Sequence, residues 1–239
     1  MARQAANGRP QRSEQRKEGI LKGAERVFAR KGFQEATISE VARESGVADA
    51  TIYDYFASKE EILFTIPLKT TRKGKEKLEE YLTYIRSASD KLRAITHSYL
   101  DFYEKHPDYA AVALLILKQN PKFLETEAYR IIREASRTIL RVVEEGAASG
   151  EFHPGADPYI TRTMLLGSIE HTVISWLLLN RPSSPSSTAE ALSEQIIHGL
   201  LRSRDQGDWR IEITFSSHGE ERHCRISPEQ GNSSPSNNS

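Results

Sequence analysis

Hydrophobic residues recur at helical spacing along most of the chain. Ile20, Ala24, Val27 and Phe28 fall on one face of a helix predicted from Ser13 to Lys31, where Gly32 ends it. The same period and its punctuation predict further helices over 37–45, 48–56, 58–86, 89–105, 107–119, 121–148, 157–180 and 187–204. Pro67 lies inside the helix 58–86 and is expected to kink or break it. The pattern therefore predicts an all-α fold.

The segment 37–59, TISEVARESGVADATIYDYFASK, organises the rest of the chain. Thr37 and Glu40 form a capping box that starts a short helix, and Gly46 ends it in a left-handed conformation. A second helix is predicted over 48–56, and Ser58 and Glu61 form the capping box of the next one. Two helices joined by a glycine-containing turn are the helix-turn-helix signature, whose second helix enters the DNA major groove.

The pattern changes after Arg204. Residues 209–215 alternate apolar and polar side chains, which predicts a short strand, and His223–Ile226 is expected to pair with it across 216–219 as a hairpin. Residues 1–12 and the tail from about 228 are rich in polar residues, and we expect both to be disordered.

Charge and composition refine this reading. The formal net charge is zero, yet nine Arg and Lys residues face three Glu residues up to Lys31, so residues 1–12 form a basic arm suited to phosphate contact. Cys224 is the only cysteine, which excludes an intrachain disulfide and fits a reducing cytoplasm. We find no signal peptide, membrane-length apolar run, metal-ligand cluster or nucleotide-binding loop, so we expect a soluble cytoplasmic protein without a cofactor.

The helix-turn-helix segment resembles the TetR family of bacterial transcriptional repressors. The resemblance covers about residues 14–66 and is carried by Thr37, Ile38, Val41, Ala42, Gly46-Val47, Thr51-Ile52-Tyr53, Tyr55-Phe56, Ser58-Lys59-Glu60 and Leu63. It implies a three-helix DNA-binding domain over 13–58, a helical ligand-binding and dimerisation domain over 59–204, and an extension over 205–239 outside the family pattern.

The resemblance also implies the DNA contacts. The recognition helix, which starts at Ala48, would read bases through Asp49, Ala50 and Thr51, while the phosphate backbone would be held by Thr37, Tyr53, Tyr55 and Lys59. Loss of Lys59 would then weaken binding to every sequence and lower its salt dependence. Many family members have Ser and Gly where this chain has Ala48 and Ala50, and Ala48 offers no hydroxyl cap.

Residues 159–179 are apolar on more than one face, which is typical of a helix buried in a bundle or against a second subunit. In TetR proteins the last two long helices form the dimer contact. The resemblance therefore implies a homodimer on a palindromic operator, with Trp176, Leu177 and Leu179 at the interface. An intrachain core is the alternative.

Four segments extend the resemblance to the TetR subgroup that controls fatty-acid degradation: GVADATIYDYFASKEEIL, LKQNPKF, VVEEGAASGEF and LGSIEHTVISWLL. Members of that subgroup release DNA on binding long-chain acyl-CoA, a small hydrophobic effector. The implied ligand residues are Tyr99, Phe102, Tyr103, Leu114, Leu117, Phe123, Arg130, Arg133, Met164, His171 and Ile174. For the apolar ones core packing is the alternative, and for the arginines a solvated face paired with Glu125, Glu127 and Glu134.

Two other functions stay open at this point. A regulator of drug efflux would need buried carboxylates opposite aromatic rings, and Asp101 and Glu170 are the nearest candidates. An enzyme or carrier acting on acyl-CoA would need a nucleophile and base, and the sequence shows no such set, so we expect no catalytic residues.

Overall fold

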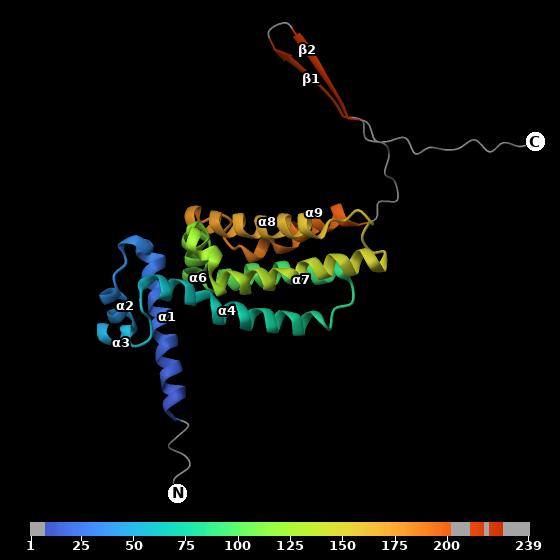
Figure 1. Cartoon of the computed structure of the whole chain (residues 1–239). Coiled ribbons are helices and arrows are strands. Elements are labelled where there is room, and N and C mark those ends of the chain that lie inside the picture. Colours follow the sequence, from blue (N-terminus) through green and yellow to red (C-terminus); the bar gives the residue numbers. More distant parts are fainter. Residues whose placement is uncertain (1–7, 202–210, 218–219, 227–239) are drawn as a thin grey trace, which may run out of the picture. The chain divides into compact units, whose positions relative to one another are not determined.

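The computed structural model describes residues 8–201, 211–217 and 220–226. Its contacts divide the chain into two compact units, Met1–Leu201 and Arg202–Ser239. The first unit is helical and the second contains a two-stranded hairpin (Figure 1). The predicted all-α fold with a short C-terminal hairpin is therefore confirmed.

The first helix, α1 (Gly8–Glu35), is longer than predicted. It begins at Gly8 and not at Ser13, so residues 8–12 of the arm expected to be disordered are helical. Pro10 suits this position, since its fixed φ is compatible with the first turn of a helix and it has no N–H to leave unpaired. Gly32 interrupts the helix as expected, because its backbone (φ 78°, ψ 167°) lies outside the helical region.

The next two helices are α2 (Ile38–Ser45) and α3 (Asp49–Tyr53). Both halves of the predicted capping box are present, because Thr37 Oγ1 accepts from the Glu40 amide and Glu40 accepts from the Thr37 amide. Gly46 ends α2 with φ 67°. The helix α3 is shorter than the predicted 48–56, since the chain turns after Tyr53 to bury Phe56 and to bring Ser58 to the start of α4.

The helix α4 (Lys59–Leu82) leads from this helix-turn-helix into the bundle (Figure 1). It continues through Pro67 without a break, contrary to one of the two predicted outcomes. Proline cannot donate to the carbonyl four residues earlier, Leu63. Its ring is buried beside Ile62, Leu63 and Ile66, and this apolar burial offsets the missing hydrogen bond.

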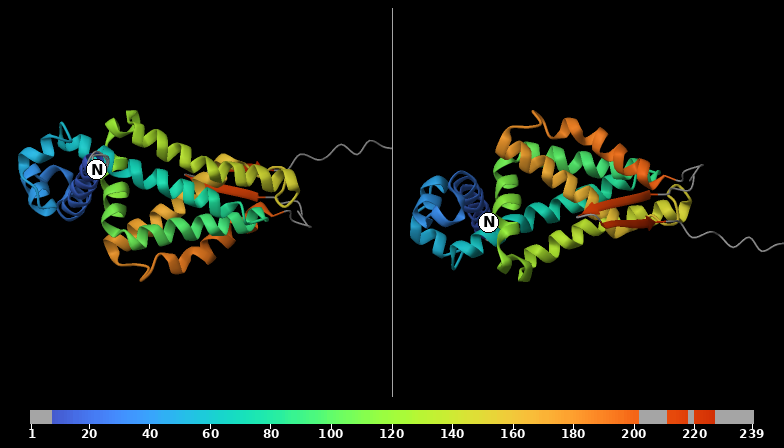
Figure 2. Two further views of the ribbon diagram at one scale, coloured as in Figure 1. Left: turned by 90° about the horizontal axis from the view of Figure 1, so that it is seen from below. Right: turned by 90° about the horizontal axis from the view of Figure 1, so that it is seen from above.

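The remaining helices pack side by side as the bundle (Figure 2). They are α5 (Ala88–Lys105), α6 (Pro107–Ala111), α7 (Glu127–Ser149), α8 (Pro158–Leu179) and α9 (Ala189–Leu200). The predicted helix 107–119 is divided into α6, the π-helical turn η1 (Val112–Ile116) and the 3₁₀ turn η2 (Leu117–Gln119). Two more 3₁₀ turns, η3 (Pro121–Glu125) and η4 (Ser186–Thr188), precede α7 and α9.

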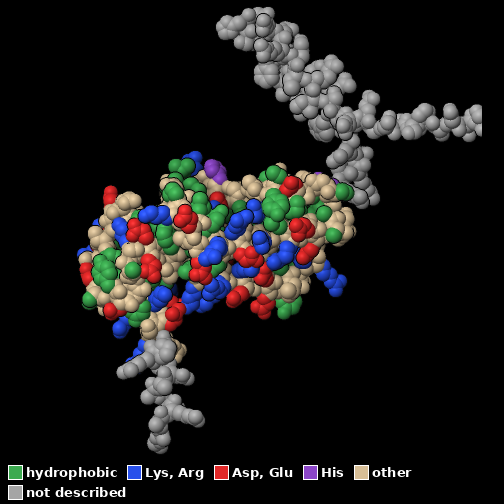
Figure 3. Space-filling model, in the orientation of Figure 1, with side chains coloured by type: hydrophobic (Ala, Val, Ile, Leu, Met, Phe, Trp, Pro, Cys, Tyr) green, Lys and Arg blue, Asp and Glu red, His purple; other side chains and the backbone are tan. Residues whose placement is uncertain are grey.

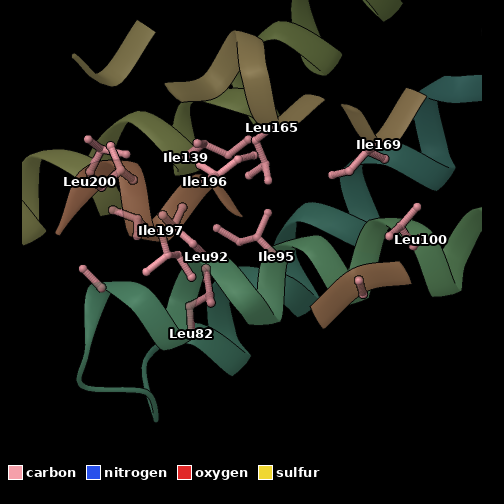
Figure 4. Packing of buried hydrophobic residues seen from close by; sticks show 14 of the residues in the cluster. Leu82, Leu92, Ile95, Leu100, Ile139, Leu165, Ile169, Ile196, Ile197 and Leu200 are labelled. Atoms are coloured by element: carbon pink, nitrogen blue, oxygen red, sulfur yellow. The ribbon is translucent and has the colours of Figure 1, made fainter. Parts of the chain in front are cut away.

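Buried apolar residues form two clusters. The bundle cluster joins α5, α7, α8 and α9 through Leu92, Ile95, Ile139, Leu165, Ile169 and Ile197 (Figure 4). The second, which we call the junction core, joins α1–α4 to α6, η1, η2, η3 and the start of α7. Ile20, Phe28 and Phe56 there share one cluster with Tyr109 and Val112. The helix-turn-helix and the bundle are therefore fixed to one another by a common apolar core.

The hairpin consists of β1 (Ile211–Ser217) and β2 (Glu220–Ile226). The strands are antiparallel, and their register places Ile211 opposite Ile226 and Ile213 opposite Cys224. This agrees with the predicted pairing, although β1 extends to Ser217, into the expected connection, and β2 begins at Glu220, three residues before the expected His223. Trp209, the predicted first strand residue, lies outside the described residues. Among the described residues no helix is long and apolar enough to span a membrane.

Lys59, the first residue of α4, fixes the turn between α1 and α2. Its Nζ donates to the carbonyl oxygens of Phe33 (2.7 Å), Gln34 (3.2 Å) and Ala36 (2.8 Å) and lies 4.5 Å from the centroid of the Phe33 ring. An ammonium carries three donors, so these bonds use all of them. The kink at Gly32 is what presents these carbonyl groups to Lys59.

We predict that Lys59→Met lowers the free energy of unfolding by about 2 kcal/mol, because three carbonyl oxygens lose a charged donor. Urea denaturation followed by circular dichroism measures the change. Lys73→Met is the matched control, since Lys73 lies exposed on the same helix and has no ion pair in the described part of the chain. Equal midpoints for both variants would contradict the assignment.

Candidate DNA-binding and effector sites

The predicted base-reading residues share one exposed surface on α3. Ala48, Asp49 and Ala50 are exposed, Thr51 is half-buried, and the Tyr53 side chain is 60% exposed. Ile52 is fully buried on the opposite side and holds α3 against the rest of the helix-turn-helix. Small side chains at 48 and 50 leave the backbone of this surface open to close approach by a partner.

Neighbouring hydroxyl groups fix two of these residues. Ala48 starts α3 without a side-chain cap, as expected, and the Asp49 carboxylate accepts a hydrogen bond from Ser39 on α2. The Tyr55 hydroxyl accepts from Ser13 Oγ on α1 at 3.2 Å. Thr37 is exposed beside them at the start of α2. The sequence did not point to Ser39, because its partner lies ten residues away across the turn.

Lys59 departs from the predicted phosphate contact. Its three donors are bonded to backbone carbonyl groups, so none is free for a phosphate oxygen in this structure. The sequence could not show this, since the acceptors are 23 to 26 residues away and become accessible only through the Gly32 kink.

Three basic residues of α1 form ion pairs with glutamates of α2. Arg26 and Arg30 pair with Glu44 at 2.6 and 3.5 Å, and Lys31 pairs with Glu40. The hydrogen bond from Lys31 is the main reason that the pKa of Glu40 falls to about 2. Arg12 and Arg16 are exposed near the start of α1 and have no ion pair among the described residues.

A pair of carboxylates lies where α1 meets α6. Partial burial, followed by the nearby charge of Asp108, raises the pKa of Glu25 to about 7, while Lys22 and Arg26 oppose the shift. A raised carboxyl pKa means that folding favours the protonated form. Its contribution to stability is present below about pH 4.5 and is lost as the pH rises to about 7. The sequence did not predict that Glu25 and Asp108 lie near one another, because they are far apart in the chain and belong to different helices.

Most of the apolar ligand candidates lie inside the bundle or the junction core. Tyr99 and Ile174 pack against the bundle cluster, which contains Leu114, while Leu117 and Phe123 belong to the junction core. Tyr103 contacts both clusters. The rings of Phe102 and Tyr103 contact Tyr109, with centroids 5.2 and 6.4 Å apart, so an aromatic group joins α5 to α6. Burial raises the pKa of Tyr99 to about 12, which keeps its phenol neutral.

Met164 and His171 are a correction, because they do not face the interior. Both are exposed on the outer side of α8, Met164 with 52% of its surface. Ile160, Met164, Gly167, His171 and Leu178 follow helical spacing along this side, which we call the outer α8 face. The apolar character of α8 all round hid the two faces from sequence reasoning.

The three predicted interface residues divide between the two sides of α8. Trp176 and Leu177 are half-buried and pack against the bundle cluster. Leu179 is 67% exposed and Leu178 beside it is 62% exposed. On α9 the small or polar residues Ala191, Gln195 and His198 are exposed at matching spacing.

Arg130 and Arg133 lie exposed on α7, and neither has a carboxylate within ion-pair distance in the described residues. Their neighbours are paired: Arg72 with Glu127 at 3.5 Å, and Arg137 with Glu134 at 3.2 Å. Figure 3 shows basic and acidic side chains interspersed over α4 and α7. Arg130 and Arg133 are therefore two solvent-exposed guanidinium groups on this surface.

Two hollows open on the surface away from most of these residues. One of about 910 Å³ lies between the end of α4, α5 and Ser186, lined by Tyr81, Tyr84, Ile85, His97 and Asp101. Another of about 340 Å³ lies between α4 and the start of α7, over Phe64, Leu68 and Ala128. Neither hollow is lined by a residue assigned to acyl-CoA, and Asp101, a carboxylate considered for a cationic drug, lines the larger one. The Phe64 ring of the smaller hollow contacts Phe123, with ring centroids 6.2 Å apart.

The carboxylates considered for a cationic drug are paired with lysines. Asp101 bonds Lys105 at 2.8 Å, and Glu170 bonds Lys118. Neither is left to balance the charge of a bound cation. Among the described residues no group of three His, Cys, Asp or Glu side chains is arranged to hold a metal ion.

Comparison with known proteins now places the chain. Residues 20–66 match the model of bacterial regulatory proteins of the tetR family, and residues 72–199 match the model of the YsiA-like protein C-terminal region, one of the TetR C-terminal domains. A fatty acid metabolism regulator protein of Bacillus subtilis is 27% identical over 181 residues, which are 76% of this chain and 93% of the relative.

Solved structures agree with these matches. The transcriptional regulator FadR of Bacillus subtilis in complex with stearoyl-CoA has 27% identity and a TM-score of 0.69, covering 77% of this chain and 98% of that one. The fatty acid degradation regulator FadR of Bacillus halodurans, at 22% identity, shares the fold with a TM-score of 0.72 over 78% of this chain and 97% of that one. Both halves of the helical unit thus match one family in sequence and in fold, and the chain belongs to the TetR family of bacterial transcription regulators.

Proposed function

We propose that this protein is a cytoplasmic transcriptional repressor that binds a palindromic operator as a homodimer and releases it on binding long-chain acyl-CoA. One observation carries the proposal: the relative whose structure holds stearoyl-CoA matches this chain through both the helix-turn-helix and the bundle. The relatives compared are transcription regulators, which supports a regulatory and not an enzymatic role.

The surface of α3 is the proposed reading surface. Asp49, Ala50 and Thr51 lie where they can meet base edges, and a threonine hydroxyl or methyl can contact either kind of base pair. Thr37, Tyr53 and Tyr55 surround them as neutral donors to phosphate oxygens. The charged phosphate contacts are assigned to Arg12 and Arg16 of α1, in place of Lys59.

The outer α8 face is the proposed dimer contact. Exposed apolar side chains gathered on one surface mark a contact with another molecule, and this face carries Ile160, Met164 and Leu178, with Leu179 exposed beside its end. A two-fold dimer through this face would pair each α8 and α9 with their counterparts. Two reading surfaces would then meet successive major grooves about 34 Å apart.

The acyl chain is assigned to the interior around Tyr99, Phe102, Tyr103, Leu114 and Ile174. Arg130 and Arg133 are assigned to the phosphates of the CoA group, since guanidinium forks bind phosphate oxygens in pairs. Insertion of a chain must displace packed side chains, including rings that contact Tyr109. Tyr109 belongs to the junction core, so the displacement reaches α1. The effector then favours the conformation that does not fit the operator.

For DNA reading, we predict that Thr51→Ala weakens binding to the operator about tenfold, and that it does not change binding to unrelated DNA, because only a base contact is lost. Tyr53→Phe should instead weaken binding to both by a few-fold, because a phosphate contact carries no sequence information. Fluorescence anisotropy on both DNA fragments measures the two effects. Equal losses on both fragments for Thr51→Ala would contradict its role.

For the dimer, we predict that Met164→Glu combined with Leu178→Glu converts the protein from dimer to monomer at micromolar concentration, because each subunit then buries two charges at the contact. Analytical ultracentrifugation gives the state directly. Tyr84→Glu is the control, since Tyr84 is also large and 80% exposed but lies at the end of α4. A dimeric double variant would rule out the outer α8 face.

For the effector, stearoyl-CoA at micromolar concentration should release the protein from DNA taken from upstream of its own gene, and free CoA should not. Exchange of both Arg130 and Arg133 for Gln should raise the required concentration at least tenfold, because charge-assisted bonds to phosphate are lost. Arg137→Gln, already paired with Glu134, is the control. Tight DNA binding that ignores stearoyl-CoA would refute the effector and keep the DNA-binding role.

A further inference from the structure

The end of α2 packs directly on the backbone of α1 at Gly23. Gly23 is buried, and a Cβ atom placed on it would overlap Ser45 Oγ and lie 3.1 Å from Ser45 Cβ and 3.2 Å from the Ser45 backbone nitrogen. A residue without a side chain permits this close approach of two helices. Gly19, one turn earlier on α1, is exposed instead, and nothing in the described structure packs within 4 Å of a Cβ placed there.

The Ser45 hydroxyl group fills the space that a side chain at position 23 would occupy. Its oxygen is buried and has no hydrogen-bond partner among the described residues. A buried polar atom without a partner costs free energy, so hydrogen bonding is not what holds this group against α1. The contact is one of shape, and it sets how closely the end of α2 approaches α1.

Ion pairs hold the same end of α2 against α1. Arg26 donates to the Glu44 carboxylate at 2.6 Å and to the Glu44 carbonyl oxygen at 3.4 Å, and Arg30 lies 3.5 Å from that carboxylate. Gly23, Arg26 and Arg30 fall at spacings of three and four, so they share one face of α1. The ion pairs draw the end of α2 toward this face, and the contact between Gly23 and Ser45 limits how near it comes.

The position of Ser45 affects α3 through a short, hydrogen-bonded turn. Ser45 is the last residue of α2, and α3 begins at Asp49. Between them, the amides of Gly46 and Val47 donate to carbonyl groups of the last turn of α2 at 3.3 and 3.0 Å. A turn bonded in this way has little freedom to absorb a shift, and packed segments transmit displacement. A displacement of the end of α2 therefore also moves α3.

We propose that Gly23 is a positioning residue for operator binding, because its contact with Ser45 sets the place of the reading surface of α3 relative to α1. This rests on the proposed function, in which α3 reads base edges and Arg12 and Arg16 of α1 contact phosphates. Base contacts require accurate placement in the groove, whereas phosphate contacts carry no sequence information. A shift between α1 and α3 therefore weakens specific binding more than non-specific binding.

The test compares Gly23→Ala with Gly19→Ala in the full-length protein. Both exchanges add one methyl group to α1 and favour its helical state, but only the methyl group at position 23 meets α2. Gly23→Ala should lower the affinity for DNA from upstream of the protein's own gene about fivefold, and the affinity for unrelated DNA by less than about twofold. Gly19→Ala should change neither. Fluorescence anisotropy measures the affinities, and circular dichroism checks that both variants are folded.

Shortening Ser45 should restore binding, because it makes room for the added methyl group. Rotation of the hydroxyl relieves only the overlap with Oγ, so the rescue uses Ser45→Gly, which removes Cβ as well. In the Ser45→Gly background, Gly23→Ala should cost less than about twofold in operator affinity. If Gly23→Ala alone does not fold, the double variant must fold and bind the operator as Ser45→Gly does, and failure of either overturns the positioning role.

The remaining outcomes separate the two proposals. Equal operator affinities of Gly23→Ala and Gly19→Ala overturn the positioning role and leave the repressor proposal intact. Equal losses on both DNA fragments also overturn it, as does a loss of the same size in the Ser45→Gly background. A wild-type protein that binds unrelated DNA and its own upstream DNA equally refutes the proposed function, and the positioning role with it.

Discussion

The junction core is the constraint on which the rest of the helical unit depends. Ile20 and Phe28 of α1 are buried in the same cluster as Tyr109 of α6 and Val112 of η1, so no boundary of polar residues separates the helix-turn-helix from the bundle. The π-helical turn η1 lies in this core, and such wide turns are frequent at functional sites. A change at α6 cannot relax locally, because close-packed interiors transmit displacement. If the proposed effector binds in the bundle, this shared core is the route by which its displacement would reach the helix-turn-helix.

Polar contacts from α4 to α1 and to the turn after it add to the apolar contacts of the junction core. Lys59 ties the start of α4 to the turn after α1, and Lys69, further along α4, pairs with Glu14 and Glu18 of α1. The helix α4 is thus held to α1 at two points about three turns apart, one on each side of Pro67. At the α1–α6 contact, Glu25 faces Asp108, and repulsion between the two carboxylates opposes the apolar attraction.

Features set by near neighbours could be predicted from the sequence. The caps at Thr37 and Ser58, the left-handed Gly46 and the alternating strands depend on residues a few positions apart. Features set by tertiary contacts could not. The early end of α3 follows from burial of Phe56, and the role of Lys59 follows from a kink 27 residues before it. Met164 was misplaced because α8 is apolar on both sides, so only the folded bundle decides which side faces out.

Because α1 begins at Gly8, Arg12 and Arg16 lie on a formed helix before they contact a polyanion. A flexible arm would lose backbone entropy on every encounter, about 1–2 kcal/mol for each residue that becomes ordered. Here the backbone around Arg12 and Arg16 is already helical in the free protein, and Glu14 and Glu18 hold this part of α1 against Lys69. The entropy cost of ordering this backbone is therefore incurred during folding. Binding a partner then has to fix only the rotamers of the arginine side chains. The spacing of the Arg12 and Arg16 backbone positions along α1 is consequently set before any partner arrives.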